Sequence, residues 1–395
     1  MTQHPAKKTT LIAGCTAHAI QDGLSASIYV LLPILAQTFG LNYSQIGMFK
    51  GIKSLSQAVL EIFSGHATER YGGRRILLFG LTALGAGYLF LSIASGAGVV
   101  LLCFALIGAG SAFHHAPSSA LISTAFTQKA RRRALGFYNS AGDAGKLVFT
   151  SGLSLALLAA LSWQSVAFTY GAVALLAGIA VFFVLKYRAI GQITAGKTDD
   201  ITTDAGKPLG WGILDRGKFA ALLATVFFDS MVQSGVLTFS AFVMIAKGVP
   251  APIATVAAVL VLIGGMFGKA LCGFLADRFG VRPAFALLQV LTATGLVLLV
   301  ITPITASYIL LPALGVVVQG TTSITYVIVN DLVHPDRTAR GYSMIYGASS
   351  FAALAGPMGF GLIGDQFGIE FTLVAMATTA IIAIFPCWFL KPSLS

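Results

Sequence analysis

Long apolar stretches recur along the chain and constrain its fold more than any other feature. A helix needs roughly 20 mostly apolar residues to cross a bilayer, and twelve stretches of the 395-residue sequence meet that requirement. Their centres lie near Ser25, Leu55, Gly85, Ile107, Leu147, Leu175, Gln233, Leu262, Thr292, Gly320, Phe351 and Ala380. The sequence therefore predicts an all-α membrane protein with twelve transmembrane helices.

The low content of charged residues supports a membrane location. Asp, Glu, Lys and Arg make up 10 % of the chain, whereas a soluble domain carries about 25 %, so most of the surface cannot face water. The four cysteines stand alone in apolar runs, without the paired spacing of a disulfide framework or a zinc site. No catalytic constellation is evident either. We therefore expect no enzymatic activity, no cofactor and no bound metal.

Basic residues alternate between successive connections. One set of connections is rich in Lys and Arg, whereas the other set, such as "FGLNYS" and "SGAG", carries almost none apart from Lys247. Basic connections favour the cytoplasmic side, so we expect both termini and the polar linker of residues 187–217 to be cytoplasmic in a bacterial inner membrane. This topology explains the net charge of +11, and no interleaving of aromatic and basic residues suggests nucleic-acid binding.

A short pattern occurs once in each half of the chain. "GHATERYGGRR" begins at Gly65, and "GFLADRFGVRP" begins at Gly273, 208 positions later. Both place an acid, an arginine, a glycine and a second arginine at the same offsets: Gly65, Glu69, Arg70, Gly72 and Arg74, then Gly273, Asp277, Arg278, Gly280 and Arg282. Glycine permits a tight turn and close approach of helices, so we predict an internal repeat with a turn at each copy.

The repeated pattern resembles the loop motif between the second and third helices of the major facilitator superfamily. The resemblance implies two six-helix bundles, residues 1–186 and 218–395, around a central cavity that opens by alternating access. It also implies that the motif acids, Glu69 and Asp277, help to hold the outward-facing state. We expect a monomer in the lipid bilayer.

A narrower resemblance points to one group within that superfamily. "AHAIQDG" in the first helix, "FHHAPSS" in the fourth and "GFYNSAGDAGK" in the fifth resemble fosmidomycin-resistance-type exporters. His115 is followed by Ala116 where that group has proline. The resemblance implies efflux of a small organic compound.

Eight acidic or basic residues lie inside the predicted spans: Asp22, Lys50, Lys53, Glu61, Asp143, Lys146, Asp229 and Lys269. Each costs about 2.5 to 3.5 kcal/mol at a helix centre, so such groups pair or line a water-filled path. Asp22 and Asp229 are 207 positions apart, close to the repeat offset, and His18 precedes Asp22 by one helical turn. We predict that Asp22, His18 and Asp229 couple transport to protons; a purely structural His–Asp pair is the alternative.

The remaining charges of the first half are mostly positive. Lys50, Lys53 and Lys146, together with His114 and His115, predict a field that favours an anionic substrate. Asp143 would hold Lys146 in place, although these two could also simply neutralise each other as an i,i+3 pair. In the second half, neutral hydrogen-bonding side chains predict a wall for the organic part of the substrate: Gln233, Tyr326, Asn330 and Tyr346.

These features favour proton-coupled efflux of a small, anionic organic compound. Uptake or exchange of an organic anion or metal chelate, without proton movement, is the main alternative. A divalent-metal transporter with Asp22, His18 and His114 as ligands is a third, and the neighbouring lysines argue against it because they would repel a cation.

Overall fold

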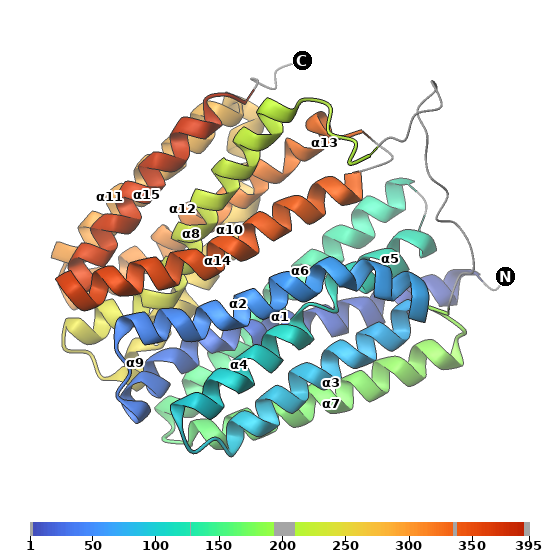
Figure 1. Cartoon of the computed structure of the whole chain (residues 1–395), viewed down its shortest axis with the longest axis horizontal. Coiled ribbons are helices and arrows are strands. Elements are labelled where there is room, and N and C mark those ends of the chain that lie inside the picture. Colours follow the sequence, from blue (N-terminus) through green and yellow to red (C-terminus); the bar gives the residue numbers. More distant parts are fainter. Residues whose placement is uncertain (1–2, 127, 193–209, 335–337, 391–395) are drawn as a thin grey trace. The chain divides into compact units, whose positions relative to one another are not determined.

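The computed structural model describes residues 3–126, 128–192, 210–334 and 338–390 (Figure 1). These parts are helical, and their one extended pairing is an isolated bridge between Ile213 and Val333. The helices of the N-terminal half are α1 (Gln3–Phe39), α2 (Tyr43–Tyr71), α3 (Gly73–Ser92), α4 (Ala97–Ser111), α5 (His115–Ala125), α6 (Gln128–Leu158) and α7 (Trp163–Tyr187). Those of the C-terminal half are α8 (Arg216–Ala246), α9 (Ala251–Ala254), α10 (Val256–Phe279), α11 (Val281–Ile301), α12 (Ile304–Val327), α13 (Val329–Leu332), α14 (Thr338–Phe367) and α15 (Ile369–Cys387).

The twelve predicted centres each fall in a different long helix, so the prediction of helical spans is confirmed. Ten helical segments of the described chain are long and apolar enough to cross a membrane, with α4 and α5 counted together. The other two long helices, α2 and α6, contain 29 and 31 residues. Charged residues such as Lys50, Lys53, Asp143 and Lys146 lower their hydropathy.

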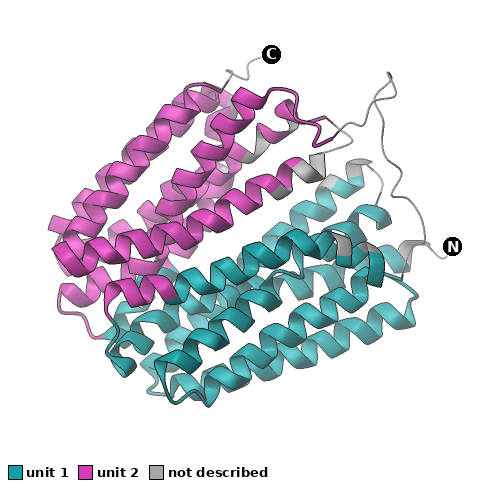
Figure 2. Cartoon of the chain, viewed as in Figure 1, with its two compact units in different colours: residues 1–41, 49–195, 251–259 teal, residues 42–48, 196–250, 260–395 magenta. Residues whose placement is uncertain are grey.

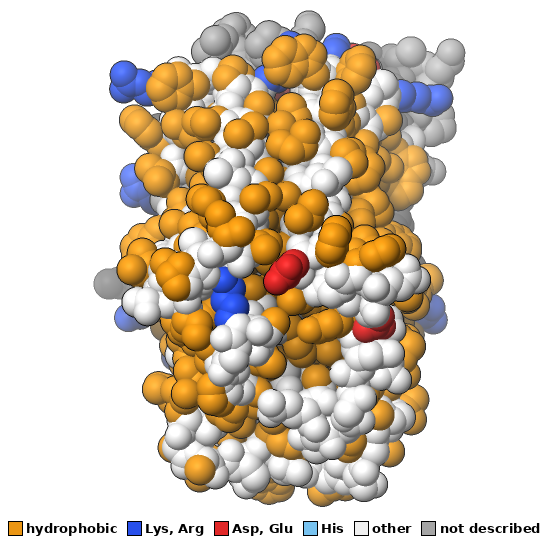
Figure 3. Space-filling view, turned by 90° about the vertical axis from the view of Figure 1, so that its left-hand side faces the viewer, with side chains coloured by type: hydrophobic (Ala, Val, Ile, Leu, Met, Phe, Trp, Pro, Cys, Tyr) orange, Lys and Arg blue, Asp and Glu red, His pale blue; other side chains and the backbone are white. Residues whose placement is uncertain are grey.

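The surface is largely apolar, as a lipid-facing surface must be. Hydrophobic side chains dominate the face drawn in Figure 3, where charged side chains are few. Large side chains such as Leu102, Phe183 and Phe385 are 71 %, 58 % and 69 % exposed. In water this exposure would be costly, but against lipid tails it is favourable.

The chain divides into two compact units (Figure 2). Unit 1 comprises residues 1–41, 49–195 and 251–259, and unit 2 comprises residues 42–48, 196–250 and 260–395. In unit 2 the carboxylate of Asp365 accepts hydrogen bonds from the backbone N–H groups of Tyr43 and Ser44, at 2.7 and 3.0 Å, and so caps the start of α2. In unit 1 the hydroxyl groups of Ser154 on α6 and Thr255 lie 2.8 Å apart.

The predicted linker lies largely outside the described residues, which exclude 193–209. Within it, the sequence "GQITAGKT" of residues 191–198 has the spacing of a phosphate-binding loop. Such a loop joins a strand to a helix, whereas this one follows helix α7. The context therefore does not support a nucleotide site, and the predicted bundle boundaries stay predictions.

The two copies of the repeated pattern adopt the same local structure. Gly72 and Gly280 are the N-caps of α3 and α11, with φ of 84° and 85°, a conformation that favours glycine. Arg70 lies over the ring of Tyr71 at 5.5 Å, and Arg278 lies over the ring of Phe279 at 5.7 Å. The predicted repeat with a tight turn is therefore confirmed.

The first glycine of each copy does not lie at a close helix contact. Among the described atoms, a Cβ added at Gly65 would meet none within 4 Å, and one added at Gly273 would meet only the Ser323 side chain, at 3.9 Å. Close helix approach therefore does not require these two glycines. The side chains of Glu69 and Asp277 lie outside the described residues, so their gating role stays a prediction.

The fourth predicted span is interrupted between α4 and α5. Pro117, in the first turn of α5, has no N–H to donate, which favours a break in the preceding turn. The break places His114 as the N-cap of α5 and His115 as its first residue. The two histidines therefore project from a helix terminus inside an apolar segment, rather than from one continuous helix.

Candidate functional site

Close packing of α1 against α6 brings the charges of both helices together. A Cβ at Gly145 would collide with the backbone of Ala19, and one at Gly142 would collide with the ring of His18. Only a small residue fits at such contacts. The glycines on either side of Asp143 thus let this carboxylate and Lys146 reach the face of α1 that carries Asp22.

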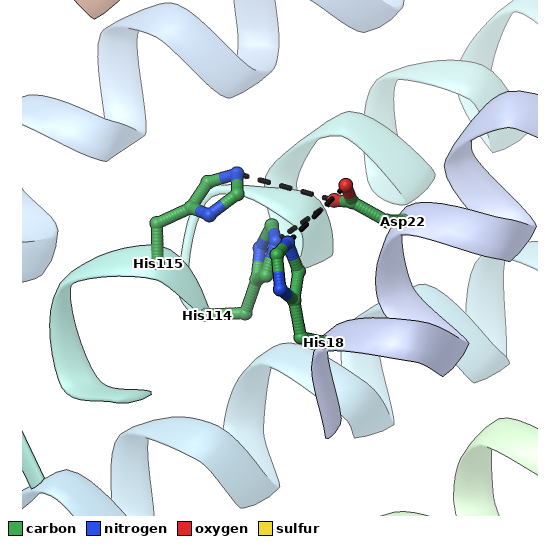
Figure 4. Close-up of side chains that lie close together, drawn as sticks. All are labelled: His18, Asp22, His114 and His115. Atoms are coloured by element: carbon green, nitrogen blue, oxygen red, sulfur yellow. Dashed lines mark hydrogen bonds and ion pairs between the residues drawn. The ribbon is translucent and has the colours of Figure 1, made fainter. Parts of the chain in front are cut away.

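Asp22 is the centre of a charged cluster in unit 1. Its Oδ2 lies 2.9 Å from Lys146 Nζ and 3.2 Å from His18 Nε2. Its Oδ1 lies 3.1 Å from His114 Nε2 and 4.0 Å from His115 Nε2 (Figure 4). The Asp22 side chain is only 12 % exposed. A carboxylate at this depth needs such partners, because an unpaired charge is costly in an apolar surrounding.

Lys146 has two carboxylate partners. Besides Asp22, its Nζ contacts Asp143 Oδ1 at 3.2 Å, three residues earlier on α6. The predicted Asp143–Lys146 pair and the predicted His18–Asp22 pair are therefore both present, joined into one network. The Lys146 side chain is 30 % exposed, so it is the most accessible member of the network that Asp22 contacts.

The backbone orients two of the histidines. His18 Nδ1 lies 2.8 Å from the carbonyl oxygen of Tyr138, and His114 Nδ1 lies 2.6 Å from the carbonyl oxygen of Ser111. A carbonyl can only accept, so each Nδ1 carries the hydrogen that it donates. Both Nε2 atoms consequently point to Asp22.

Lys50 and Lys53 lie one turn apart on α2, and each donates hydrogen bonds to uncharged side chains. Lys53 Nζ donates to Ser25 Oγ at 2.5 Å and to Gln57 Oε1 at 2.6 Å. Lys50 Nζ donates to Ser54 Oγ at 2.7 Å and lies over the Tyr29 ring. Both lysines are about 95 % buried, and neither has a carboxylate within ion-pair distance among the described side chains. In the described part of unit 1, neither buried cation is therefore held by a salt bridge, and Lys53 interacts with Asp22 and Glu61 only at longer range.

Asp229 of unit 2 has a different setting from Asp22. Gln289 Nε2 donates to its Oδ1 at 2.7 Å, and Gln233 Nε2 and Thr321 Oγ1 both donate to its Oδ2 at 2.8 Å. These three partners come from α11, α8 and α12 and are all uncharged. The Asp229 residue is 4 % exposed. A buried carboxyl group held only by neutral donors is a group that can exist with or without its proton.

The structure brings some predicted site residues together and leaves others apart. His18, Asp22, His114, His115, Asp143 and Lys146 form one network, whereas Lys50 and Lys53 have partners of their own. Gln233 contacts Asp229, but Tyr346, 39 % exposed, is not among the hydrogen-bond partners of Asp229 in the described part of the chain. The side chains of Tyr326 and Asn330 lie outside the described residues.

Sequence reasoning missed the polar partners of these charges. Gln289, Thr321, Ser25 and Gln57 hold the buried groups in place. A signal was available, since Gln289 stands in a predicted apolar span and its amide needs a partner there. The identity of that partner depends on packing between distant helices, which periodicity does not give.

The sequence matches a known family over almost its whole length. A family model of the Major Facilitator Superfamily matches residues 14–270 and 222–394. The "Uncharacterized MFS-type transporter YfnC" of Bacillus subtilis (strain 168) is 27 % identical over 386 residues, which are 95 % of this chain and 91 % of that protein. The "Fosmidomycin resistance protein" of Escherichia coli (strain K12) is 32 % identical over 103 residues, 26 % of this chain and 25 % of that protein.

Solved structures show the same fold at low sequence identity. A bacterial homolog to the human lysosomal transporter Spinster, in an inward-facing and occupied conformation, aligns with a TM-score of 0.81 at 17 % identity, over 97 % of this chain and 96 % of that chain. A mutant of the nucleoside transporter NupG aligns with a TM-score of 0.78 at 11 % identity, over 97 % of this chain and 100 % of that chain.

Proposed function

The chain belongs to the Major Facilitator Superfamily, and on that premise we propose that it is a secondary transporter that exports a small organic anion in exchange for protons. The observation that carries the proton part is the neutral hydrogen-bond shell of Asp229. The observation that supports the anion part is the pair of buried lysines, Lys50 and Lys53.

The surroundings of Asp229 suit both protonation states. Thr321 Oγ1 lies 2.8 Å from Asp229 Oδ2 and 2.9 Å from the carbonyl oxygen of Val318. When the acid is ionised, the hydroxyl donates to the carboxylate. When the acid is protonated, its O–H donates to the hydroxyl, which then donates to Val318. The Thr321–Asp229 hydrogen bond is therefore kept in each state, because a hydroxyl can donate and accept.

Protonation of Asp229 leaves no cationic side chain without its ion-pair partner among the described contacts of this residue. Its described hydrogen-bond donors are two amides and one hydroxyl, and the Cys387 thiol on α15 also interacts with it electrostatically. Asp22 differs, since Lys146 and two histidines contact it. We therefore assign the coupling proton to Asp229. The predicted coupling role of Asp22 and His18 stays untested, and their contacts favour another role, developed below.

Lys50 and Lys53 supply the positive charge for substrate. A buried ammonium group without an ionic partner is unfavourable, and an anionic substrate would provide the missing charge. Ser25, Ser54 and Gln57 already orient both ammonium groups. Lys146, the accessible cation of the neighbouring network, adds to the same positive field.

The export direction and the location rest on other observations. The relative named for fosmidomycin resistance matches over 103 residues, and efflux is the direction that a resistance protein would need. The alternation of basic connections supports a bacterial inner membrane with both termini in the cytoplasm.

Transport by purified protein in liposomes that contain a pH-sensitive dye tests this function. A panel of carboxylates, phosphonates, acidic drugs and uncharged analogues would be added to wild-type protein and to Lys53→Met. We expect proton movement with anions, absent with the uncharged analogues and strongly reduced in Lys53→Met. Transport of an anion without proton movement would contradict the proposal and would favour anion uptake or exchange.

A further inference from the structure

Four metal-ligating side chains meet at one point of unit 1. One ligand atom from each of His18, Asp22, His114 and His115 lies within 4.8 Å of the others (Figure 4). The three imidazoles come from α1 and from the broken segment between α4 and α5. Two are almost fully buried, at 5 % and 1 % side-chain exposure for His18 and His114. Three imidazole nitrogens and one carboxylate oxygen therefore converge within 4.8 Å of one another in a largely buried part of unit 1.

Backbone contacts orient two of these histidines so that their Nε2 atoms face the centre of the cluster. Because Nδ1 of His18 and of His114 donates to a backbone carbonyl, the neutral ring carries its lone pair on Nε2. These Nε2 atoms face the Asp22 oxygens at 3.2 and 3.1 Å. The contact of His18 Nε2 with Asp22 is an ion pair without hydrogen-bond geometry, whereas His114 Nε2 is hydrogen-bonded to Asp22 Oδ1. With both rings neutral, the two lone pairs and the carboxylate favour a positive charge among them, which a proton on either ring or a bound metal ion would supply. Lys146, whose Nζ lies 2.9 Å from Asp22 Oδ2, is the positive charge already beside them.

We propose that His18, Asp22, His114 and His115 form a binding site for a divalent transition-metal ion of the Zn²⁺ class. Imidazole nitrogen with one carboxylate suits Zn²⁺, Co²⁺, Ni²⁺ or Cu²⁺, whereas Mg²⁺ and Ca²⁺ prefer oxygen ligands. Metal-bound histidines usually donate their second N–H to a backbone carbonyl or carboxylate, which fixes the ring. His18 and His114 already make that bond.

The ammonium group of Lys146 would repel a metal ion at Asp22, but Asp143 offers this lysine a second carboxylate partner. Its Nζ contacts Asp22 Oδ2, on the opposite side of the carboxylate from His114 and His115, which face Oδ1. It also contacts Asp143 at 3.2 Å and is 30 % exposed. Lys146 can therefore leave Asp22 for Asp143 when a metal binds. Metal and Lys146 therefore compete for Asp22, so the repulsion by neighbouring lysines that argues against a divalent-metal transporter does not by itself exclude a metal at this cluster.

Co²⁺ titration of purified, chelator-stripped protein in detergent tests the site. Four-coordinate Co²⁺ absorbs visible light, and Zn²⁺ should displace it. We expect one equivalent to bind to wild type, and the affinity to fall by at least about a hundredfold in His114→Ala and in Asp22→Asn, since even outer-shell partners are worth 10- to 100-fold. Lys146→Met should bind more tightly, because the competing cation is gone.

Two further variants serve as a control and as a second test of a ligand. His334→Ala removes a histidine of unit 2 and should bind like wild type. His115→Ala removes the partly exposed ligand, at 29 % side-chain exposure, so it tests the site even if His114→Ala does not fold. No stoichiometric binding to wild type, or equal binding by wild type, Asp22→Asn and His115→Ala, would overturn the proposal. Proton transport measured with a chelator present is independent of this outcome, so the two proposals fail separately.

Discussion

Asp22 and Asp229 occupy matching places in the two halves of the sequence, yet their partners differ in charge. Asp22 contacts Lys146 and histidines, while Asp229 is held by Gln233, Gln289 and Thr321. The repeat alone predicts two similar acids. This difference in partners is the reason for proposing two different roles, a proton carrier in unit 2 and a cation-binding centre in unit 1.

The hydroxyl of Thr321 is the part of the Asp229 shell that serves both protonation states, so its loss should impair coupling. We expect Thr321→Val to lower substrate-driven proton flux about tenfold, because a hydrogen bond to a charged group is worth about 1.5–3 kcal/mol. Thr325→Val is the matched control, since the buried Thr325 hydroxyl donates only to backbone carbonyls of the same helix. Dye-loaded liposomes would measure both variants. Equal flux in the two would contradict the role of Thr321.

Lys53 should contribute directly to anion affinity. Replacing it by methionine keeps the apolar stem and removes a buried ammonium group that donates to Ser25 and Gln57. We expect the anion concentration for half-maximal transport to rise at least about tenfold, as for other charge-assisted hydrogen bonds. Lys186→Met, which removes an exposed cation near the end of α7, should leave this concentration unchanged. An unchanged value in Lys53→Met would exclude the lysine from the substrate site.

Most of the helical spans of this protein could be predicted from apolar length alone, but their interruptions could not. Each predicted centre lies in a separate helix, because about 20 apolar residues specify a span whatever its neighbours are. The break before His115 depends on Pro117 within an otherwise apolar run. That break orients His114 and His115. The sequence therefore indicates which histidines lie in the spans, but it does not predict that they meet around Asp22.

The glycines of the repeated motif should differ in their tolerance of substitution. Gly72 has φ of 84° and caps α3, so Gly72→Ala should destabilise the protein by about 1–3 kcal/mol through backbone strain. Gly65→Ala is the natural control, since its Cβ would meet open space within a helix, where alanine is favoured by about 1 kcal/mol. Thermal unfolding in detergent, followed by tryptophan fluorescence, would compare them. A lower midpoint for Gly65→Ala than for Gly72→Ala would contradict this assignment.

At the scale of the whole molecule, the distribution of basic residues predicts orientation in the membrane. Single cysteines introduced into a cysteine-free background would report it, with a membrane-impermeant maleimide applied to intact cells. We expect Ser95→Cys, in a connection poor in basic residues, to react, and Arg75→Cys, at the start of α3, to be protected until the cells are opened. The reverse pattern would invert the topology and with it the export direction.

The sequence predicts the overall architecture of the molecule but not the polar contacts between its helices. The family, the helical spans and the internal repeat follow from apolar length and from five motif positions in each half. The hydrogen-bond shell of Asp229 joins α8 to residues of α11 and α12 that lie 60 and 92 positions further along the chain. The partners of Lys53 lie on α1 and α2. Such contacts arise only when the helices pack.

Asp229→Asn separates transport from proton coupling and so tests the proposed function most directly. Asparagine has nearly the same shape as the acid but cannot release a proton, so the variant imitates the permanently protonated state. In liposomes, exchange of labelled for unlabelled substrate needs no net proton movement, whereas accumulation driven by a pH gradient does. We predict that Asp229→Asn retains exchange and loses gradient-driven accumulation. Accumulation at the wild-type level in Asp229→Asn would contradict the assignment of the coupling proton to this residue.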